Sequence, residues 1–202
     1  MKRLNVYIDG FNLYFGIEES GFPNCKWLEV HALAENIKHN SQVLNKVKYF
    51  TSRINNNLEK QKRQNTYLDA LLTTPISITY GQFRNQPMQC RHCSYHWFEA
   101  KEKMTDVNIA TAILIDAYKN EFDVAFLISG DSDLVPPVKA IRELFPQKEI
   151  RVVFPPGRES NVLKNSASAS FVLGKKKLED SQLPEELQSK TGAILKRPPS
   201  WI

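Results

Sequence analysis

The sequence has few cysteines and no long hydrophobic run. Three cysteines among 202 residues are an odd number, which argues against the disulfide framework of a small secreted protein. No apolar run reaches the ~18 residues that a membrane-spanning helix requires. Asp9 and Asn12 interrupt the apolar stretch that follows the basic N-terminus, so the start does not resemble a signal peptide. We therefore expect a cytoplasmic protein that does not associate with membranes.

The composition shows no bias toward a disordered or collagen-like chain. Eleven prolines, 8 glycines and a charged fraction of 24% are ordinary amounts, and 42% hydrophobic residues suffice for one sizeable core. The 27 Lys and Arg exceed the 22 Asp and Glu, and the net charge of +5 favours a polyanionic partner such as nucleic acid. A solvated helix and strand rim explains the same excess about as well.

Segments with a strand pattern alternate with segments of helical periodicity. The strand segments lie near 4–9, 47–51, 76–80, 124–129 and 150–154, and the helical segments near 12–19, 28–40, 58–72, 105–118 and 134–145. Pro136 and Pro137 are tolerated only in a first turn, so the last of these helices begins near Leu134. Alternating strands and helices predict an α/β fold with a parallel sheet and helices on both faces.

Two segments lack this alternation. Residues 82–103 combine polar, cysteine, histidine and aromatic residues with no clear period, which indicates an insertion without regular structure. Residues 174–202 begin with three lysines after Gly174 and show little periodicity, which indicates a C-terminal tail or loosely docked appendage. We therefore assign residues 1–173 to one α/β domain.

Four aspartates fall at one predicted edge of the sheet. Asp9 ends the first strand, and Asp131 and Asp133 follow the fourth strand. Asp106 begins a helix, and in such folds a helix begins at the edge where the parallel strands end. Ligands of open parallel sheets bind at this carboxyl edge. Each aspartate by itself is also explained as a helix N-cap or a turn residue.

A cluster of four carboxylates requires a neutralising cation, because like charges within ~5 Å repel by about 1 to 3 kcal/mol per pair. Oxygen ligands of this kind suit Mg²⁺ or Mn²⁺, which can activate a water against a phosphodiester. The pattern therefore predicts metal-assisted phosphodiester hydrolysis. Asn12 is placed to orient a ligand carboxylate or to cap a helix. Lys103 is placed to meet a phosphate, while Ser129 and Thr105 offer supporting hydroxyls.

Motifs of other nucleotide-binding and hydrolytic classes are absent. The sequence contains no G-x-G-x-x-G after the first strand, no G-x-x-x-x-G-K-[ST] and no G-x-S-x-G. Asp131-Ser132-Asp133 does not continue as an EF-hand, because Val135 and Pro136 occupy positions that need an oxygen ligand and a glycine.

Three motifs together resemble the NYN domains of the PIN-like nuclease superfamily, LabA-like branch. They are D-G-F-N at 9–12, K-x-x-D at 103–106 and S-G-D-S-D at 129–133, and the match covers about residues 3–172. The resemblance implies a Rossmann-like three-layer α/β/α sandwich in which the first and fourth strands are adjacent. It also implies a Mg²⁺- or Mn²⁺-dependent ribonuclease whose metal-binding acids are Asp9, Asp106, Asp131 and Asp133, with Asn12 as a supporting polar residue. A noncatalytic RNA-binding or regulatory module and a metal-dependent phosphatase or nucleotide hydrolase remain alternatives.

Cys90, Cys93 and His96 have the spacing of a zinc knuckle. A fourth Zn²⁺ ligand would come from a second chain in a homodimer, or from one of four residues of this chain, namely Cys25, His31, His39 and His92. The alternative is a reduced and structurally inert cysteine pair.

Basic and aromatic residues interleave around these cysteines. Arg84, Arg91 and Trp97, together with Lys103, form a mixture that can stack bases and contact phosphates of single-stranded RNA. The alternative is a small aromatic core that holds the segment together.

Overall fold

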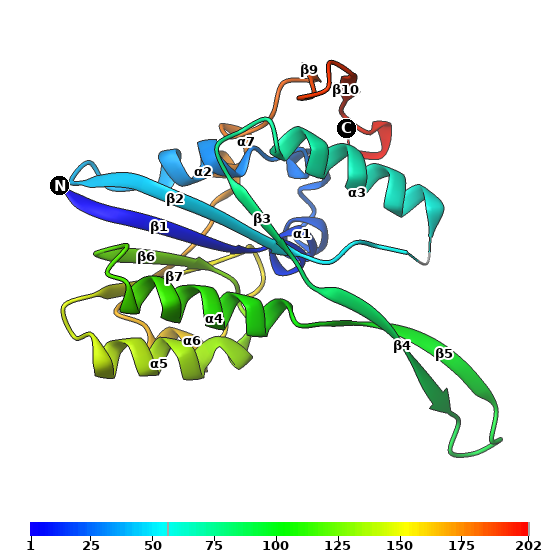
Figure 1. Ribbon diagram of the computed structural model, residues 1–202. Helices are drawn as coiled ribbons and strands as arrows, with labels where there is room; N and C mark the ends of the chain where they lie inside the picture. Colours follow the sequence, from blue (N-terminus) through cyan, green and yellow to red (C-terminus); the bar gives the residue numbers. More distant parts are fainter. Residues whose placement is uncertain (56, 202) are drawn as a thin grey trace.

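A six-stranded parallel β-sheet forms the centre of the protein, seen in a computed structural model (Figure 1). The structure describes residues 1–55 and 57–201, without the side chains at 85 and 99–101. The strand order is β3-β2-β1-β6-β7-β8, and the strands are β1 (Lys2–Asp9), β2 (Gln42–Thr51), β3 (Ser77–Tyr80), β6 (Val124–Ile128), β7 (Glu149–Phe154) and β8 (Ala169–Val172). The predicted parallel sheet is confirmed. The short edge strand β8 was not predicted, because it is largely exposed and shows no apolar alternation.

Helices cover both faces of this sheet, which confirms the three-layer α/β/α sandwich (Figure 1). One layer contains α1 (Gly10–Glu19), α2 (Val30–Ile37), α3 (Leu58–Leu71) and the short α7 (Lys175–Glu179). The opposite layer contains α4 (Thr105–Tyr118), α5 (Val135–Leu144) and α6 (Asn161–Ser166). Pro136 and Pro137 lie in the first turn of α5, as predicted.

The alternation of side chains along each strand divides the apolar interior into two parts. Val6 and Ile8 of β1 pack with α1, α2 and α3, whereas Tyr7 packs with α4 and α5 on the other face. All five residues of β6 are buried, which explains its continuous apolar run, because a central strand is covered on both faces.

Residues 82–103 form an antiparallel ribbon, which corrects the expectation of an irregular insertion. Strands β4 (Gln82–Gln89) and β5 (His96–Lys103) pair over their whole length and extend away from the sandwich (Figure 1). The sequence pattern missed them because both faces of most of the ribbon meet solvent, so no apolar and polar alternation marks the strands.

The base of the ribbon packs closely against the sheet at Gly81. A Cβ at this position would lie 2.5 Å from the Ser52 hydroxyl and 2.7 Å from the main-chain oxygen of Lys103. Only glycine permits this approach, which brings the end of β5 and the start of α4 to the carboxyl edge of the sheet.

The C-terminal residues pack onto the first layer of helices. After α7, the chain forms a small hairpin of β9 (Glu186–Gln188) and β10 (Ile194–Lys196), then the 3₁₀ turn η3 (Pro199–Trp201). Leu178, Leu183 and Trp201 are buried in the core, and the Trp27 indole donates a hydrogen bond to the Pro184 carbonyl at 2.8 Å. The described part of the predicted tail is therefore docked rather than loose, while residue 202 lies outside the described residues.

Two further 3₁₀ turns connect the main elements, η1 (Pro23–Cys25) and η2 (Ser132–Leu134). Within residues 1–55 and 57–201, no helix has both the length and the apolar content that crossing a bilayer would require.

Candidate active site

The strand order reverses between β1 and β6, and the candidate site lies at the carboxyl ends of these two strands. They pair in parallel from Leu4 with Val124 to Ile8 with Ile128, so Asp9 and Ser129 emerge side by side. The expected adjacency of the first and fourth strands is confirmed. The order 3-2-1-4-5-6, counted over the six strands of the sheet, creates a crevice here because the connections leave β1 and β6 in opposite directions.

Asp9 is buried at the bottom of this crevice with a relative exposure of 5%. One carboxylate oxygen accepts a hydrogen bond from the Asn12 amide at 3.0 Å, and the other accepts from the Ser129 hydroxyl at 3.0 Å. Asp9 is thus the N-cap of α1 as well as a site residue. Burial raises the pKa of Asp9 to about 7, against these two hydrogen bonds, and the charges of Asp106 and Glu102 raise it further.

Asn12 links the start of α1 to the loop after β6. Its side-chain oxygen accepts a hydrogen bond from the Gly130 amide at 2.9 Å. The Ser129 hydroxyl accepts from the Asp131 amide at 3.1 Å, and the Asp131 carboxylate accepts from the Asp133 amide at 2.9 Å. Asn12 therefore positions the loop that carries two of the predicted acids, rather than capping a helix.

Asp106 lies in the first turn of α4 and makes no capping bond, since α4 has no side-chain N-cap. Burial raises the pKa of Asp106 to about 6, and the negative charges of Asp131, Glu102 and Asp133 add to the increase. Asp106 therefore shares an electrostatic environment with acids that precede and follow it along the chain. Unlike Asp9 and Asp131, it has no capping role that would explain its position.

Glu102 is a fifth acid at this site that the sequence pattern missed. It is the penultimate residue of β5, and its carboxylate accepts a hydrogen bond from the Thr105 hydroxyl. Its charge raises the pKa of both Asp9 and Asp106. The only sequence signal was its position four residues before Asp106. That position indicates a site residue only because the ribbon ends at the site.

The acids do not form a ready-made direct coordination shell. Among the described residues, no three His, Cys, Asp or Glu side chains are arranged to hold a metal ion together. The binding of one ion by Asp9, Asp106, Asp131 and Asp133 stays a prediction. The chemistry of the site fits a divalent cation, because carboxylate oxygens suit Mg²⁺ and a cation stabilises a buried carboxylate that has like-charged neighbours.

The cysteine turn at the ribbon's end holds no three-ligand zinc group within the described chain. Cys90 and Tyr95 close the turn by a main-chain hydrogen bond of 2.8 Å, and Cys93 is exposed. The amides of Cys93 and His92 lower the pKa of the Cys90 thiol. Cys25 is buried in the main core. Zinc at Cys90, Cys93 and His96 stays a prediction that needs ligands from elsewhere.

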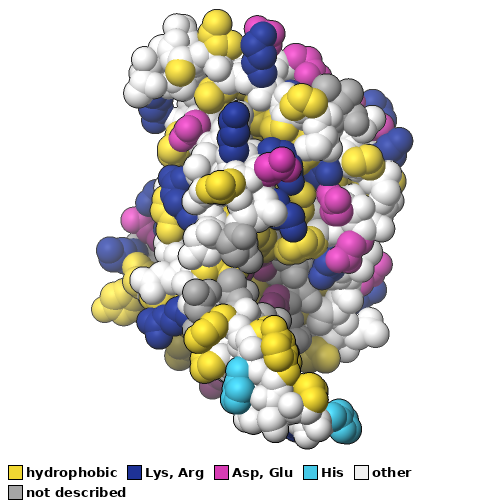
Figure 2. All heavy atoms as spheres, turned by 90° about the vertical axis from the view of Figure 1, so that its right-hand side faces the viewer, with side chains coloured by type: hydrophobic (Ala, Val, Ile, Leu, Met, Phe, Trp, Pro, Cys, Tyr) yellow, Lys and Arg dark blue, Asp and Glu magenta, His cyan; other side chains and the backbone are white. Residues whose placement is uncertain are grey.

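The residues predicted to contact RNA are spread along the ribbon. The register places Arg84, Trp97 and Lys103 on one face, with Lys103 at the base and Trp97 near the turn. The Trp97 ring stacks on Tyr95 at 6.2 Å, and Arg91 is exposed in the turn. Figure 2 shows hydrophobic side chains and two histidines gathered at the ribbon's end. Only Lys103 of this set lies close in sequence and structure to the acids.

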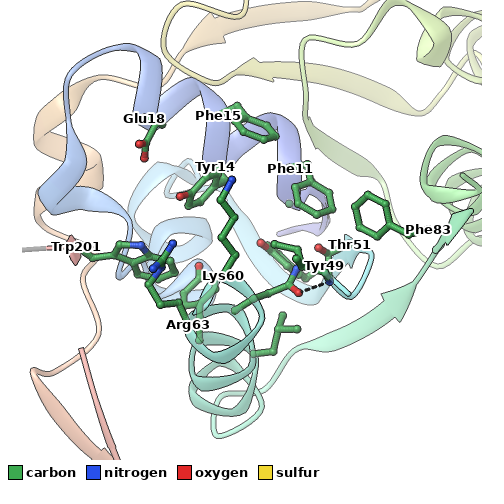
Figure 3. A pocket seen from close by; sticks show the side chains of 15 residues that line it. Phe11, Tyr14, Phe15, Glu18, Tyr49, Thr51, Lys60, Arg63, Phe83 and Trp201 are labelled. Atoms are coloured by element: carbon green, nitrogen blue, oxygen red, sulfur yellow. Dashed lines mark hydrogen bonds between the residues drawn. The ribbon is translucent and has the colours of Figure 1, made fainter. Parts of the chain in front are cut away.

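A cavity of about 410 Å³ lies beside the acids, between α1 and α3. It begins at Gly10, the residue after Asp9, and the end of β2 and the base of β4 also line it. Figure 3 shows the labelled side chains around it, which include Phe11, Tyr14 and Phe15 of α1, Lys60 and Arg63 of α3, and Phe83 of β4. No pattern in the sequence predicted this cavity.

We expect Gly130→Ala to lower the free energy of unfolding by about 3 kcal/mol. A Cβ at Gly130 would overlap the main-chain oxygen of Arg158 and lie 2.9 Å from its carbonyl carbon, which cannot move as a side chain can. Chemical denaturation measures the change. Gly174→Ala is the matched control and should be nearly neutral, because a Cβ there meets nothing within 4 Å. Equal stabilities of the two variants would contradict the close approach.

Comparisons with known proteins agree with this fold. The model of the NYN domain family matches residues 3–174. The 6-hydroxy-3-succinoylpyridine 3-monooxygenase HspA of Pseudomonas putida is 25% identical over 245 aligned positions, which cover 98% of this chain and 75% of that protein. A crystal structure of a protein of unknown function from Vibrio parahaemolyticus matches with a TM-score of 0.57 at 19% identity, over 90% of this chain and 96% of that one. Because the family match spans most of the chain, the protein belongs to the NYN domain family.

Proposed function

We propose that this NYN domain is a divalent-metal-dependent ribonuclease that hydrolyses RNA phosphodiester bonds at the carboxyl edge of its sheet. The observation that carries the proposal is the gathering of Asp9, Asp106, Asp131 and Glu102 at the strand-order reversal. Burial and like charge there raise the pKa of Asp9 and of Asp106. An aspartate that only caps a helix does not require other acids close to it. The resemblance of the motifs and the family membership support the same chemistry.

The carboxylates of Asp9, Asp106, Asp131 and Asp133 would hold Mg²⁺ or Mn²⁺. Such an ion lowers the pKa of a water and offsets the negative charge of a phosphate. Asn12 and Ser129 keep the two strand ends in register through their bonds to Gly130 and Asp9. Hydrolysis adds the water oxygen to phosphorus and breaks one P–O bond to a ribose.

Single-turnover cleavage of labelled single-stranded RNA tests the proposal. We expect cleavage with Mg²⁺ or Mn²⁺, none with EDTA, and a rate about 10- to 100-fold lower for Asp131→Asn, because the variant loses a carboxylate charge that would help to hold the ion. Asp69→Asn removes an equivalent charge from an exposed position on α3 and should leave the rate unchanged. Cleavage that persists at the wild-type rate in EDTA or in Asp131→Asn would overturn the assignment.

The same experiment separates the alternative functions. RNA that binds but stays intact with either metal would indicate a noncatalytic RNA-binding module. Phosphate release from mononucleotides, with RNA left intact, would indicate a phosphatase or nucleotide hydrolase.

The ribbon face that carries Arg84, Trp97 and Lys103 is proposed to guide single-stranded RNA toward the acids. Its basic groups would contact the phosphates of the RNA, and the exposed Trp97 ring offers a surface on which a base can stack. This face continues to Lys103, three residues before Asp106 along the chain.

Oxidation of a substituted pyridine is a second candidate function, taken from the name of the Pseudomonas relative. The aromatic cavity beside Asp9 favours it, because its volume of about 410 Å³ accommodates a small ring. A monooxygenase adds one atom of O₂ to its substrate, and a two-electron reductant reduces the other atom to water. Oxygen uptake that depends on 6-hydroxy-3-succinoylpyridine and a two-electron reductant would support this candidate. RNA cleavage without any such oxygen uptake would exclude the oxidation.

A further inference from the structure

The cavity between α1 and α3 has walls made of aromatic rings. Phe11 stacks against Phe15 with ring centroids 6.1 Å apart, and it forms a T-shaped pair with Phe83 at a centroid distance of 5.9 Å. Phe15 is 44% exposed, and Phe11 and Phe83 are half-buried, so their faces are not consumed by packing within the core. Partly open aromatic faces around a cavity suit a planar ring that stacks or packs edge-on.

Two cations of α3 stand at the mouth of this cavity. Lys60 and Arg63 are three residues apart and therefore share a face of the helix (Figure 3). Lys60 makes no ion pair with any described residue, and Arg63 approaches Glu59 only at 4.0 Å. Glu18, an acid of the same lining, is already paired with Lys26 at 2.6 Å. The rim therefore presents a net positive charge that suits an anionic group of a ligand.

The Tyr49 hydroxyl supplies a polar group inside the cavity. Tyr49 lines the cavity and has a relative exposure of 5%. Its hydroxyl lies under Gly10, where a Cβ would be 2.5 Å away. Tyr67 and Gln64, which also line the cavity, have hydrogen-bond partners within the protein. Gln64 bonds to Ile54 and to Ser52, each at 2.8 Å.

The cavity lies next to the acids of the candidate active site. Gly10 lines it and follows Asp9 directly, and Phe83 is two residues from Gly81, where the ribbon meets the sheet. An RNA strand with one phosphodiester at the acids would have its neighbouring base within reach of the cavity. A volume of about 410 Å³ lies in the range of pockets that hold molecules of nucleotide size.

We propose that this cavity is a nucleotide subsite, in which a base packs among Phe11, Phe15 and Phe83 while Lys60 and Arg63 bind a phosphate of the same RNA strand. The Tyr49 hydroxyl bonds to a polar atom of the base or ribose. This inference rests on the proposed ribonuclease function for the identity of the ligand, because a planar ring with an anionic group also describes a free aromatic acid.

Equilibrium binding of a short fluorescein-labelled single-stranded RNA, measured by anisotropy in EDTA, tests the subsite without requiring cleavage. We expect Phe83→Leu to weaken binding about tenfold through the lost ring face, and Lys60→Gln to weaken it several-fold. Lys62→Gln is the matched control on the same helix, because Lys62 is exposed and does not line the cavity. Tyr118→Leu, 80% exposed on α4, controls for the aromatic change. Thermal melting verifies that each variant is folded.

Two competitors identify the ligand that the cavity prefers. Uridine monophosphate should displace the labelled RNA from the wild-type protein, and pyridine-3-carboxylate should not. Binding that is equal in wild type, Phe83→Leu and Lys60→Gln would overturn the subsite, as would displacement by the pyridine acid alone. The proposed nuclease function would fail in a different way. RNA would then still bind through the cavity, but it would not be cleaved with Mg²⁺ or Mn²⁺.

Discussion

Replacing Asp9 with asparagine is expected to lower the rate of RNA cleavage by about 10³-fold, or ~4 kcal/mol of transition-state stabilisation. Asp9 is the most buried acid of the site, and its carboxylate faces a crevice rather than a salt-bridge partner. Asparagine keeps an oxygen that can accept the hydrogen bond from the Asn12 amide, so the start of α1 is preserved while the charge is lost. Single-turnover rates with Mn²⁺ at saturating protein measure the effect.

The Asp9 prediction has a control for folding and one for charge. The melting temperature of Asp9→Asn without metal should not fall, because the buried carboxylate is costly in the absence of a cation. Asp69→Asn should cleave RNA at the wild-type rate, since its side chain is exposed on α3. If folded Asp9→Asn protein cleaves RNA at a rate within threefold of the wild-type rate, Asp9 is not part of the catalytic site.

Asp106→Asn is expected to stabilise the metal-free protein by about 1 to 2 kcal/mol at pH 8, but not at pH 4. The native pKa of Asp106 is raised to about 6, above the ordinary value of 3.8. The folded state therefore binds this proton more tightly than the unfolded state, so wild type loses stability as the pH rises from about 4 to about 6. Asparagine resembles the protonated acid and avoids that loss. Denaturant titrations at several pH values in EDTA measure the difference.

Added Mg²⁺ and the Asp123→Asn variant serve as controls for the stability of Asp106→Asn. Adding Mg²⁺ should stabilise wild type more than the variant, because only the native acid site binds the ion. Asp123→Asn should behave oppositely at pH 7 and destabilise the protein. Its hydrogen bonds from Arg3 lower the pKa of Asp123 to about 2, so its charged form stabilises the fold above pH 4. If Asp106→Asn is destabilising in EDTA at pH 8, Asp106 is a structural residue.

Local sequence patterns were sufficient to predict the positions of those site residues that lie at the ends of strands and the starts of helices. Asp9 is the last residue of β1, and Asp131 comes shortly after the continuous apolar run of β6. Because parallel strands end at one edge, their positions could be predicted without knowing which strands are neighbours. Pro136 marked the start of α5 in the same way, since the first turn of a helix tolerates proline.

Residues of the ribbon show where such patterns fail. Trp97 and Arg84 lie on a two-stranded ribbon whose faces meet solvent, so no period of apolar residues marked it as β-structure. Glu102 consequently could not be placed at the site, although it acts on both Asp9 and Asp106. Trp201 lay in a segment of weak periodicity, and it is buried because other elements provide the apolar surface that covers it.

The sequence by itself determined the alternation of strands and helices, and the placing of four aspartates at strand ends and helix starts, because short-range periodicity and steric rules govern these features. Only the tertiary structure decided the charge states of the acids, the recruitment of Glu102 and the aromatic cavity. Asn12 bonds to Gly130 across 118 residues, and the cavity joins α1, α3 and the ribbon. Burial and electrostatic interaction depend on such distant neighbours, which no local pattern specifies.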